Sequence, residues 1–340
     1  MKLGRISSAT PDGPDERIVA VDLAGDRVVD LARAFALVQR RRGAWDAGAR
    51  RLARAVFPSS MSAAIAAGPL FLDAAHVALA AADDASIPLD AVDWVAPLDP
   101  PMIRDGLTFQ DHIVNYSRRA ANALPNPSIY RMPGYFKGST GSIYGPGAEV
   151  PYPSFSSWID YELEIGYVIG KPGSDLTPDE SFDHIFGVTI FNDFSARDVQ
   201  LVEIAIGMGP QHGKDFAFGI GPWITTMDEI GSIEGLTGSV RINGEVWSQC
   251  RAENMVWSPA ELVAYVSVAD SLQPGDLIAS GTMGNGSSIE LGRELSPGDV
   301  VELTLEGVGT LRHTMSAEKK AYPWWPEPKP YPFADAGAAG

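Results

Sequence analysis

The clearest pattern of apolar and polar positions along the chain lies in residues 160–170. From Leu163 onward this stretch is largely apolar and rich in β-branched residues, and it contains no proline. A short apolar run of this kind predicts a strand that is largely buried. Because successive side chains of a strand point to opposite faces, one face is expected to carry Asp160, Glu162 and Glu164.

Two interpretations of this acidic face are open. Neighbouring side chains on one face of a strand stand roughly 6.5–7 Å apart. Two carboxylates buried at that spacing are costly unless a cation neutralises them, and carboxylate oxygens suit Mg²⁺, Mn²⁺ or Ca²⁺. The alternative is that this face is exposed to solvent and that only the opposite face is packed.

The first part of the chain has the pattern of a small α+β unit. Residues 18–23 and 27–31 predict two short strands. Residues 31–82 are rich in alanine, leucine and arginine at helical spacing, with breaks at glycine or proline. A stiff, proline-containing stretch follows at residues 96–101, and a domain boundary there gives an accessory domain over residues 1–98.

Beyond this boundary the pattern changes from helices toward strands. Residues 240–247 predict a hairpin that turns at Asn243-Gly244, a strong local signal. Residues 277–280 and 300–305 predict further strands, each preceded by a Pro-Gly-Asp turn. The second part of the chain is therefore expected to be mainly β.

Two helix starts and an irregular tail complete the pattern. Residues 177–180 and 258–261 each have the sequence of a capping box with proline at the first helical position. The end of the chain is rich in proline and aromatic residues, so it is expected to be neither helix nor central strand. It is expected to pack its aromatic residues over the body or over a partner subunit. We assign residues 99–320 to one main domain and residues 321–340 to a C-terminal tail.

Composition and charge narrow the class of protein. The 340 residues allow two domains, and 45% hydrophobic with 20% charged residues is ordinary for a soluble globular protein. The net charge of −17 argues against nucleic acid and membranes as partners, but a bound metal leaves room for an anionic substrate. Cys250 is the only cysteine, which excludes an internal disulfide and a thiolate metal cluster. No signal-peptide pattern or long apolar run occurs, so a cytoplasmic protein is expected.

Polar groups gather at four places in otherwise apolar or glycine-rich surroundings. The first is an aspartate followed seven residues later by a histidine, and the second is the acidic strand. The third follows a predicted buried strand over residues 187–191, and the fourth is a lysine beside a glycine. The four segments are Arg104–His112, Asp160–Gly170, Asn192–Gln200 and Gly213–Phe216.

Each of these groups also has a purely structural alternative. Asp105 precedes an apolar-periodic segment and fits a helix N-cap. His112 fits an exposed position on that helix, and Lys214 fits a solvated loop. Arg197 fits an ion pair with a neighbouring turn aspartate. His212, which precedes the lysine, is expected near the site.

Taken together, these motifs resemble those of the fumarylacetoacetate hydrolase family. The acidic strand, the block Asn192–Gln200, the turn at Gly213 and the segment Ala279–Thr282 occur there in this order and at similar spacing. The resemblance covers roughly residues 99 to 317, and the N-terminal part matches the usual accessory domain only loosely. It implies an α+β, predominantly β protein, with a mixed β-sandwich roll as the catalytic domain.

The resemblance also implies the site residues and a divalent cation, with Mg²⁺ expected and Mn²⁺ or Ca²⁺ as alternatives. The positions that match the family's metal-binding carboxylates are Asp105, Glu162, Glu164 and Asp193. The positions that match its catalytic histidine, the glutamate that orients it and the lysine beside the metal are His112, Glu290 and Lys214. The positions that match substrate contacts are Arg197, Gln200 and Thr282.

The activity implied by the resemblance is metal-dependent hydrolysis of a carbon–carbon bond in a 1,3-dicarbonyl acid, acylpyruvate-like or fumarylacetoacetate-like. Phe218 and Leu107 stand where the family's namesake has a threonine and a substrate-binding tyrosine, so a substrate other than fumarylacetoacetate is expected. The same site chemistry also serves 2-oxo acid decarboxylation, isomerisation and hydration, and a catalytically silent module that binds a metal or an anion is the alternative from another class. The partners expected are a small anionic 2-oxo acid and, as in the family, a second copy in a homodimer.

Overall fold

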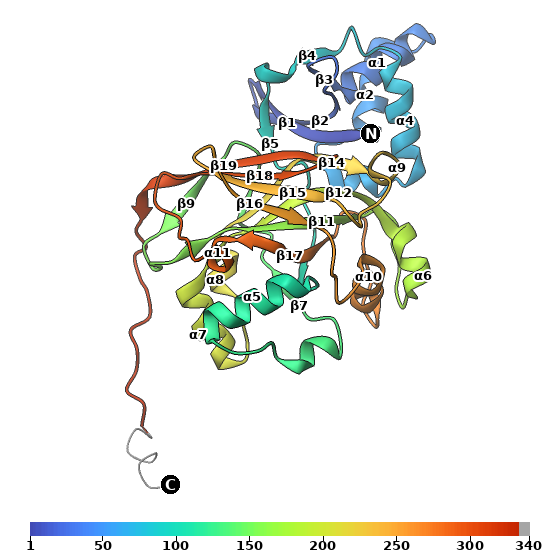
Figure 1. Cartoon of the computed structure of the whole chain (residues 1–340). Helices are drawn as coiled ribbons and strands as arrows, with labels where there is room; N and C mark the ends of the chain where they lie inside the picture. The colour runs from blue at the N-terminus through green and yellow to red at the C-terminus, as the bar shows by residue number, and fades with distance from the viewer. Residues whose placement is uncertain (333–340) are drawn as a thin grey trace.

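Two large sheets form the centre of the molecule in the computed structural model, which describes residues 1–332 (Figure 1). The N-terminal strands are β1 (Lys2–Thr10), β2 (Gly13–Asp22), β3 (Arg27–Asp30), β4 (Ser86–Pro88) and β5 (Asp93–Val95). The N-terminal helices are α1 (Leu31–Arg41), α2 (Asp46–Val56), α3 (Met61–Ile65) and α4 (Pro69–Leu79). The predicted helical region and its breaks are confirmed, whereas β1 was not predicted.

The remaining described chain supplies most of the strands. They are β6 (Ile103–Gly106), β7 (Tyr135–Gly138), β8 (Ile143–Tyr144), β9 (Glu149–Pro153), β10 (Ile159–Asp160), β11 (Glu162–Ile169), β12 (Ile185–Asp193), β13 (Ser195–Ala196), β14 (Phe218–Thr226), β15 (Thr237–Ile242), β16 (Glu245–Arg251), β17 (Leu277–Ser287), β18 (Val300–Leu305) and β19 (Gly309–Lys320). The helices are α5 (Gln110–Ala121), α6 (Pro178–Ser181), α7 (Arg197–Ile206), α8 (His212–Asp215), α9 (Met227–Ile230), α10 (Pro259–Ser267) and α11 (Ser288–Leu291). Short 3₁₀ helices occur at Leu89–Ala91, Pro127–Tyr130 and Phe182–His184.

The larger sheet has twelve strands and runs from the N-terminal part into the body of the molecule. Its order is β4-β3-β2-β1-β14-β12-β11-β17-β6-β7, with β5 paired to β1 and β8 paired to β14. The smaller sheet has the order β16-β15-β18-β19-β9, and β10 pairs with β13. Strand β1 joins β14 in antiparallel register, with Lys2 opposite Thr225. The predicted boundary at residues 96–101 therefore separates segments that share one sheet, and the division into domains stays a prediction.

Strand β11 confirms the predicted alternation and separates two cores. Leu163, Ile165 and Tyr167 belong to the core that includes Leu303 of the smaller sheet. Val168, on the opposite face, belongs to the core that the N-terminal helices cover. In Figure 1, α1, α2 and α4 lie at the upper right beside β1–β4, and α5, α7 and α8 lie below the strands of the body. The fold class is therefore α+β, predominantly β, as predicted.

Local signals in the sequence are borne out where backbone geometry decides them. The hairpin of β15 and β16 turns at Asn243-Gly244, whose φ angles of +53° and +81° suit asparagine and glycine. Both capping boxes form, and in the second the hydroxyl of Ser258 accepts a hydrogen bond from the amide of Glu261 at 3.2 Å.

The described part of the tail, residues 321–332, forms neither helix nor strand, as expected. The indole ring of Trp325 stacks on Phe155 with ring centroids 4.5 Å apart and an interplanar angle of 5°. The tail therefore packs aromatic residues over the body, which is one of the two predicted arrangements. The rest of the predicted tail, residues 333–340, lies outside the described residues. Over residues 1–332, the apolar stretches in the helices are too short to cross a membrane.

His313 of β19 is a buried imidazole between the two sheets. Its Nε2 lies 3.3 Å from the carbonyl oxygen of Tyr144, and Nδ1 has no hydrogen-bond partner in residues 1–332. A Cβ atom on Gly219 of β14 would come within 2.4 Å of the imidazole ring, so the close packing requires glycine there. Burial lowers the pKa of His313 to about 4, which keeps the imidazole neutral at physiological pH.

We expect His313 to make the fold sensitive to acid. The pKa is lowered on folding, so below pH 6.5 the unfolded chain takes up this proton first, and stability falls until the pH passes the folded-state value of about 4. Between pH 7 and 4.5 the loss amounts to roughly 2 kcal/mol. His313→Gln keeps a donor at the Nε2 position and does not titrate. Between pH 7 and 4.5, its free energy of unfolding should therefore fall by roughly 2 kcal/mol less than that of the wild type. Urea denaturation at several pH values measures this, and parallel pH curves for the two proteins would contradict it.

Candidate active site

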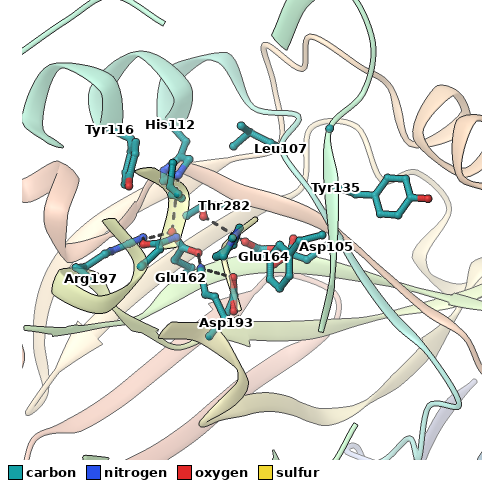
Figure 2. A pocket seen from close by; sticks show the side chains of 18 residues that line it. Asp105, Leu107, His112, Tyr116, Tyr135, Glu162, Glu164, Asp193, Arg197 and Thr282 are labelled. Atoms are coloured by element: carbon teal, nitrogen blue, oxygen red, sulfur yellow. Dashed lines mark hydrogen bonds and ion pairs between the residues drawn. The ribbon is translucent and has the colours of Figure 1, made fainter. Parts of the chain in front are cut away.

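A cavity of about 260 Å³ is lined by residues of β6, α5, β11, β12, α7 and β17 (Figure 2). Nine of the ten site residues expected from the sequence line this cavity. They are Asp105, His112, Glu162, Glu164, Asp193, Arg197, Gln200, Lys214 and Thr282. The tenth, Glu290, contacts the imidazole of His112. Groups that are spread over 186 positions of the chain therefore meet in one place.

The register of the larger sheet explains this meeting. Strand β17 lies between β6 and β11, with Ala279 opposite Asp105 and Thr282 opposite Glu164. On the other side of β11, strand β12 ends at Asp193. Three carboxylates from three strands are thus brought to the same end of the sheet, although their sequence separation exceeds anything that local periodicity detects.

Asp105, Glu164 and Asp193 form a compact acidic triad. One carboxylate oxygen from each lies within 4.8 Å of the others, and all three residues are buried. Glu164 accepts hydrogen bonds from the amide of Gly281 at 3.0 Å and from the hydroxyl of Thr282 at 3.2 Å. The Oδ1 atoms of both aspartates have no hydrogen-bond partner in the described chain. The interpretation that this acidic face is solvent-exposed is therefore wrong.

The chemistry of the triad fits a divalent cation. Burial, together with repulsion between neighbouring carboxylates, raises the pKa of all three acids well above the usual range. Without a bound cation, carboxyl groups with such raised pKa values hold protons, which a cation would replace. Orphaned carboxylate oxygens at this spacing are the ligands that Mg²⁺, Mn²⁺ and Ca²⁺ prefer.

Glu162, expected among the metal ligands, lies beside the triad and not within it. Its carboxylate accepts hydrogen bonds from Lys214 and, at 2.7 Å, from Arg197. Although burial opposes ionisation, these two cations lower the pKa of Glu162. Lys214 also donates to Asp193, so its ammonium group connects Glu162 to the triad. The lysine is buried, and the solvated-loop alternative is wrong.

Arg197, expected to contact substrate, is almost wholly committed to protein groups. Its side chain is 1% exposed, and it donates to Asp160 through Nε at 2.8 Å and Nη2 at 2.6 Å. Nη1 donates to Gln200 at 3.0 Å. Asp160 also accepts from the amide of Ser288 at the start of α11, at 2.8 Å. Asp160 was assigned to the acidic face but not to the site, so its role in holding the arginine was missed.

His112 and Glu290 form a hydrogen-bonded pair at the edge of the cavity. The Nδ1 atom of His112 lies 3.0 Å from Glu290 Oε2. Burial opposes ionisation of Glu290, but His112 and hydrogen bonds from Asn285 and Ser287 lower its pKa, so it accepts from Nδ1–H. This leaves Nε2, 3.8 Å from Glu162 Oε1, to face the cavity. His112 is buried, so the exposed-helix alternative is wrong.

The structure also rules out one alternative and places one further residue. Asp105 lies in β6 and is not a helix N-cap, because Phe109 occupies that position of α5. His212 lies outside the cavity lining, and its ring is 5.3 Å from Phe155 and 5.4 Å from Trp325. His212 therefore belongs to the aromatic cluster under the tail.

Tyr116 is a cavity residue that sequence reasoning missed. It stands one helical turn after His112 on α5, and the two rings lie 5.8 Å apart (Figure 2). Its hydroxyl oxygen is buried and has no hydrogen-bond partner in residues 1–332. The signal that could have found it is the spacing of four residues, which places both side chains on one helix face.

The part of the chain that carries the site matches a known protein family. Residues 101–316 match the family described as fumarylacetoacetate (FAA) hydrolase C-terminal. A 2,4-didehydro-3-deoxy-L-rhamnonate hydrolase of Sphingomonas sp. is 32% identical over 214 residues, which cover 62% of this chain and 71% of that protein.

Solved structures share the architecture. A fumarylacetoacetate hydrolase from the psychrophile Exiguobacterium antarcticum has 25% identity and a TM-score of 0.68, covering 94% of this chain and 100% of that one. A maleylpyruvate hydrolase of Sphingobium sp. SYK-6, in complex with manganese(II) and pyruvate, has 22% identity, a TM-score of 0.66 and coverage of 93% and 99%. Because the family match spans more than half of the 340 residues, the chain belongs to the fumarylacetoacetate hydrolase family.

Proposed function

We propose that this protein is a metal-dependent hydrolase that cleaves a carbon–carbon bond in a 1,3-dicarbonyl acid of the acylpyruvate type. The observation that carries the proposal is that the His112–Glu290 pair and the acidic triad share one cavity. A histidine with an ionised glutamate behind it, His112 with Glu290, faces the same cavity as the carboxylates of the triad. A binding module needs a cation site but no oriented base, so the pair favours an enzyme.

The cation proposed is Mg²⁺, with Mn²⁺ and Ca²⁺ as alternatives, held by Asp105, Glu164 and Asp193. The support for it is the pair of unpartnered Oδ1 atoms in this chain. The Sphingobium hydrolase shows that a protein of this fold holds manganese, and the assignment here rests on the triad itself. When bound, the cation supplies a Lewis acid that polarises the 2-oxo acid end of the substrate.

His112 acts as the general base. Its Nε2 takes a proton from water, and the resulting hydroxide adds to the acyl carbonyl carbon, whose oxygen takes up the electron pair. The carbonyl then re-forms, and the bond from this carbon to the methylene carbon breaks. The electron pair leaves with the three-carbon 2-oxo acid as an enolate. Return of the proton to the methylene carbon gives pyruvate and a carboxylic acid.

Charged side chains beside the triad hold the anionic end of the substrate. Lys214 uses two of its three N–H groups on Glu162 and Asp193, which leaves one for a substrate oxygen. The carbonyl oxygen of the Gln200 side chain accepts from Arg197, so its amide group remains as a donor. Arg197 therefore acts by holding Gln200 and Glu162 in place.

The partners proposed are a small anionic 2-oxo or 1,3-dicarbonyl acid and a second copy of this chain, with neither nucleic acid nor membrane. The net charge of −17 supports the exclusion of polyanionic partners. Exposed apolar side chains support a homodimer. They include Val202, Ile206 and Met208 of the α7 region and Trp324 of the tail, each more than 60% exposed.

We expect cation binding to depend on Glu164 and not on Asp198. A cation that binds only the folded protein adds roughly 2.7 kcal/mol to stability at a hundredfold excess over Kd. Glu164→Ala should abolish the calorimetric binding of Mn²⁺ and the rise in melting temperature. Asp198→Ala is the matched control, because this carboxylate accepts from the amides of Ser157 and Val199 outside the cavity, at 2.9 and 3.0 Å. Equal loss in both variants, or no effect of EDTA on wild-type Tm and activity, would contradict the cation site.

His112 separates hydrolysis from the other reactions that the family's chemistry allows. Decarboxylation and isomerisation need no activated water, whereas a general base contributes about 10²–10⁴ in rate. With 2,4-dioxo acids and Mg²⁺ or Mn²⁺, His112→Ala should lower kcat by that factor and leave Mn²⁺ affinity unchanged. His76→Ala, on the exposed face of α4, is the control. Mass spectrometry should find pyruvate and the carboxylic acid. Wild-type turnover by His112→Ala would favour decarboxylase or isomerase chemistry instead.

A further inference from the structure

The cavity has an apolar part that the reaction steps above do not use. Beyond the charged residues, its lining consists mainly of glycine, proline, aliphatic and aromatic groups. These residues are Gly106, Leu107, Gly134, Tyr135, Phe136, Ile204, Gly209 and Pro210. A substrate whose anionic end reaches the triad has to place its other end against this wall. The chemistry of the wall therefore selects the acyl group.

The cations of the described lining are already committed at the anionic end. Arg197 and Lys214 are its cationic side chains, apart from the titratable His112. Arg197 is bound to Asp160, Glu162 and Gln200, and Lys214 is bound to Glu162 and Asp193. A second carboxylate on the acyl chain would lose its hydration against apolar side chains without meeting a positive charge, which is costly.

One uncharged polar group of the cavity lining, beside His112 and Arg197, is not used in the reaction steps above. The hydroxyl of Tyr116 is buried and unpartnered in the described chain, unlike most buried polar groups in folded proteins. Burial raises the pKa of Tyr116, so the hydroxyl keeps its proton and can donate. Arg197 lies 5.5 Å from the centre of its ring and stabilises the position of the side chain.

We propose that Tyr116 and the apolar wall form an acyl site, which takes an uncharged acyl chain and in which the Tyr116 hydroxyl donates a hydrogen bond to the acyl carbonyl oxygen. This inference rests on the proposed hydrolytic function. His112 and Tyr116 lie on one face of α5, so one delivers water to the carbonyl carbon and the other holds the oxygen of the same carbonyl. The hydrogen bond strengthens as that oxygen becomes negative, so Tyr116 is a catalytic residue for hydroxide addition.

Tyr116→Phe tests the hydrogen bond, because it removes the hydroxyl and keeps the ring. With 2,4-dioxoheptanoate and Mn²⁺, we expect kcat to fall by about 10- to 100-fold while KM changes little, since the bond acts mainly in the transition state. Tyr130→Phe, at an exposed tyrosine outside the cavity lining, should behave as the wild type. Unchanged Mn²⁺ affinity and Tm exclude a structural effect. A normal kcat for Tyr116→Phe, with or without a raised KM, would overturn the role.

A pair of substrates of equal length tests the wall. 2,4-Dioxoheptanoate and 2,4-dioxoheptanedioate differ only in a terminal methyl or carboxylate group. We expect kcat/KM at least tenfold higher for the first, and Ile204→Arg, which adds a cation at the half-exposed edge of the wall, should narrow the difference. Preference of the wild type for the dioate would overturn the uncharged acyl site.

Binding measurements keep this inference separate from the proposed function. If neither acid yields pyruvate, the hydrolase proposal fails, and calorimetry of both acids with the Mn²⁺-loaded protein still tests the wall. In that case, tighter binding of 2,4-dioxoheptanoate than of 2,4-dioxoheptanedioate supports the uncharged acyl site, and the reverse order contradicts it. If both acids are hydrolysed at equal kcat/KM, the hydrolase proposal stands and the acyl site is wrong.

Discussion

The site depends on a buried cluster of charges in which positive groups are too few. Arg197 and Lys214 are surrounded by the carboxylates of Asp160, Glu162 and Asp193, and two further acids, Asp105 and Glu164, complete the cluster. Removing one partner from a buried ion pair typically costs 3–5 kcal/mol, because the remaining charge stays desolvated. Five acidic side chains against two cations leave a deficit of positive charge, which protons on the triad or the proposed cation would make good.

The larger sheet gives this cluster its geometry. Strands β6, β11 and β12 each contribute one carboxylate of the triad. Their spacing is fixed by β17, which pairs with both β6 and β11, and by the direct pairing of β11 with β12. A Cβ atom on residue 281 would lie only 2.7 Å from the carbonyl oxygen of Gly106, and the φ of +81° there also favours glycine, so Gly281 allows the two backbones to approach each other closely. The amide of Gly281 can then reach Glu164. Paired strands hold the acids close together, and α5 places His112 beside them.

Sequence reasoning succeeded where the determining interactions are local. The β11 alternation, the capping boxes and the Asn243-Gly244 hairpin depend on neighbouring residues and were predicted without any fold. The commitment of Arg197 to Asp160 depends on residues 37 positions apart, and periodicity carries no information about such a pair. The family resemblance identified the site residues as a group. It did not show that the carboxylate of Glu162 accepts hydrogen bonds from Arg197 and Lys214 beside the triad. It also gave no sign of Tyr116, whose buried hydroxyl has no hydrogen-bond partner in residues 1–332.

The joining of β1 to β14 has a consequence for the N-terminal part of the chain. One stretch of the β14 edge, at Phe218 and Gly219, is covered by β8, and the stretch at Ile224 and Thr225 is covered by β1. Without the first 98 residues, that second stretch would present free amide and carbonyl groups to solvent, which is a template for strand addition by other chains. Residues 1–98 therefore cover an edge of the sheet that carries the acids, although they contribute no side chain to the cavity lining.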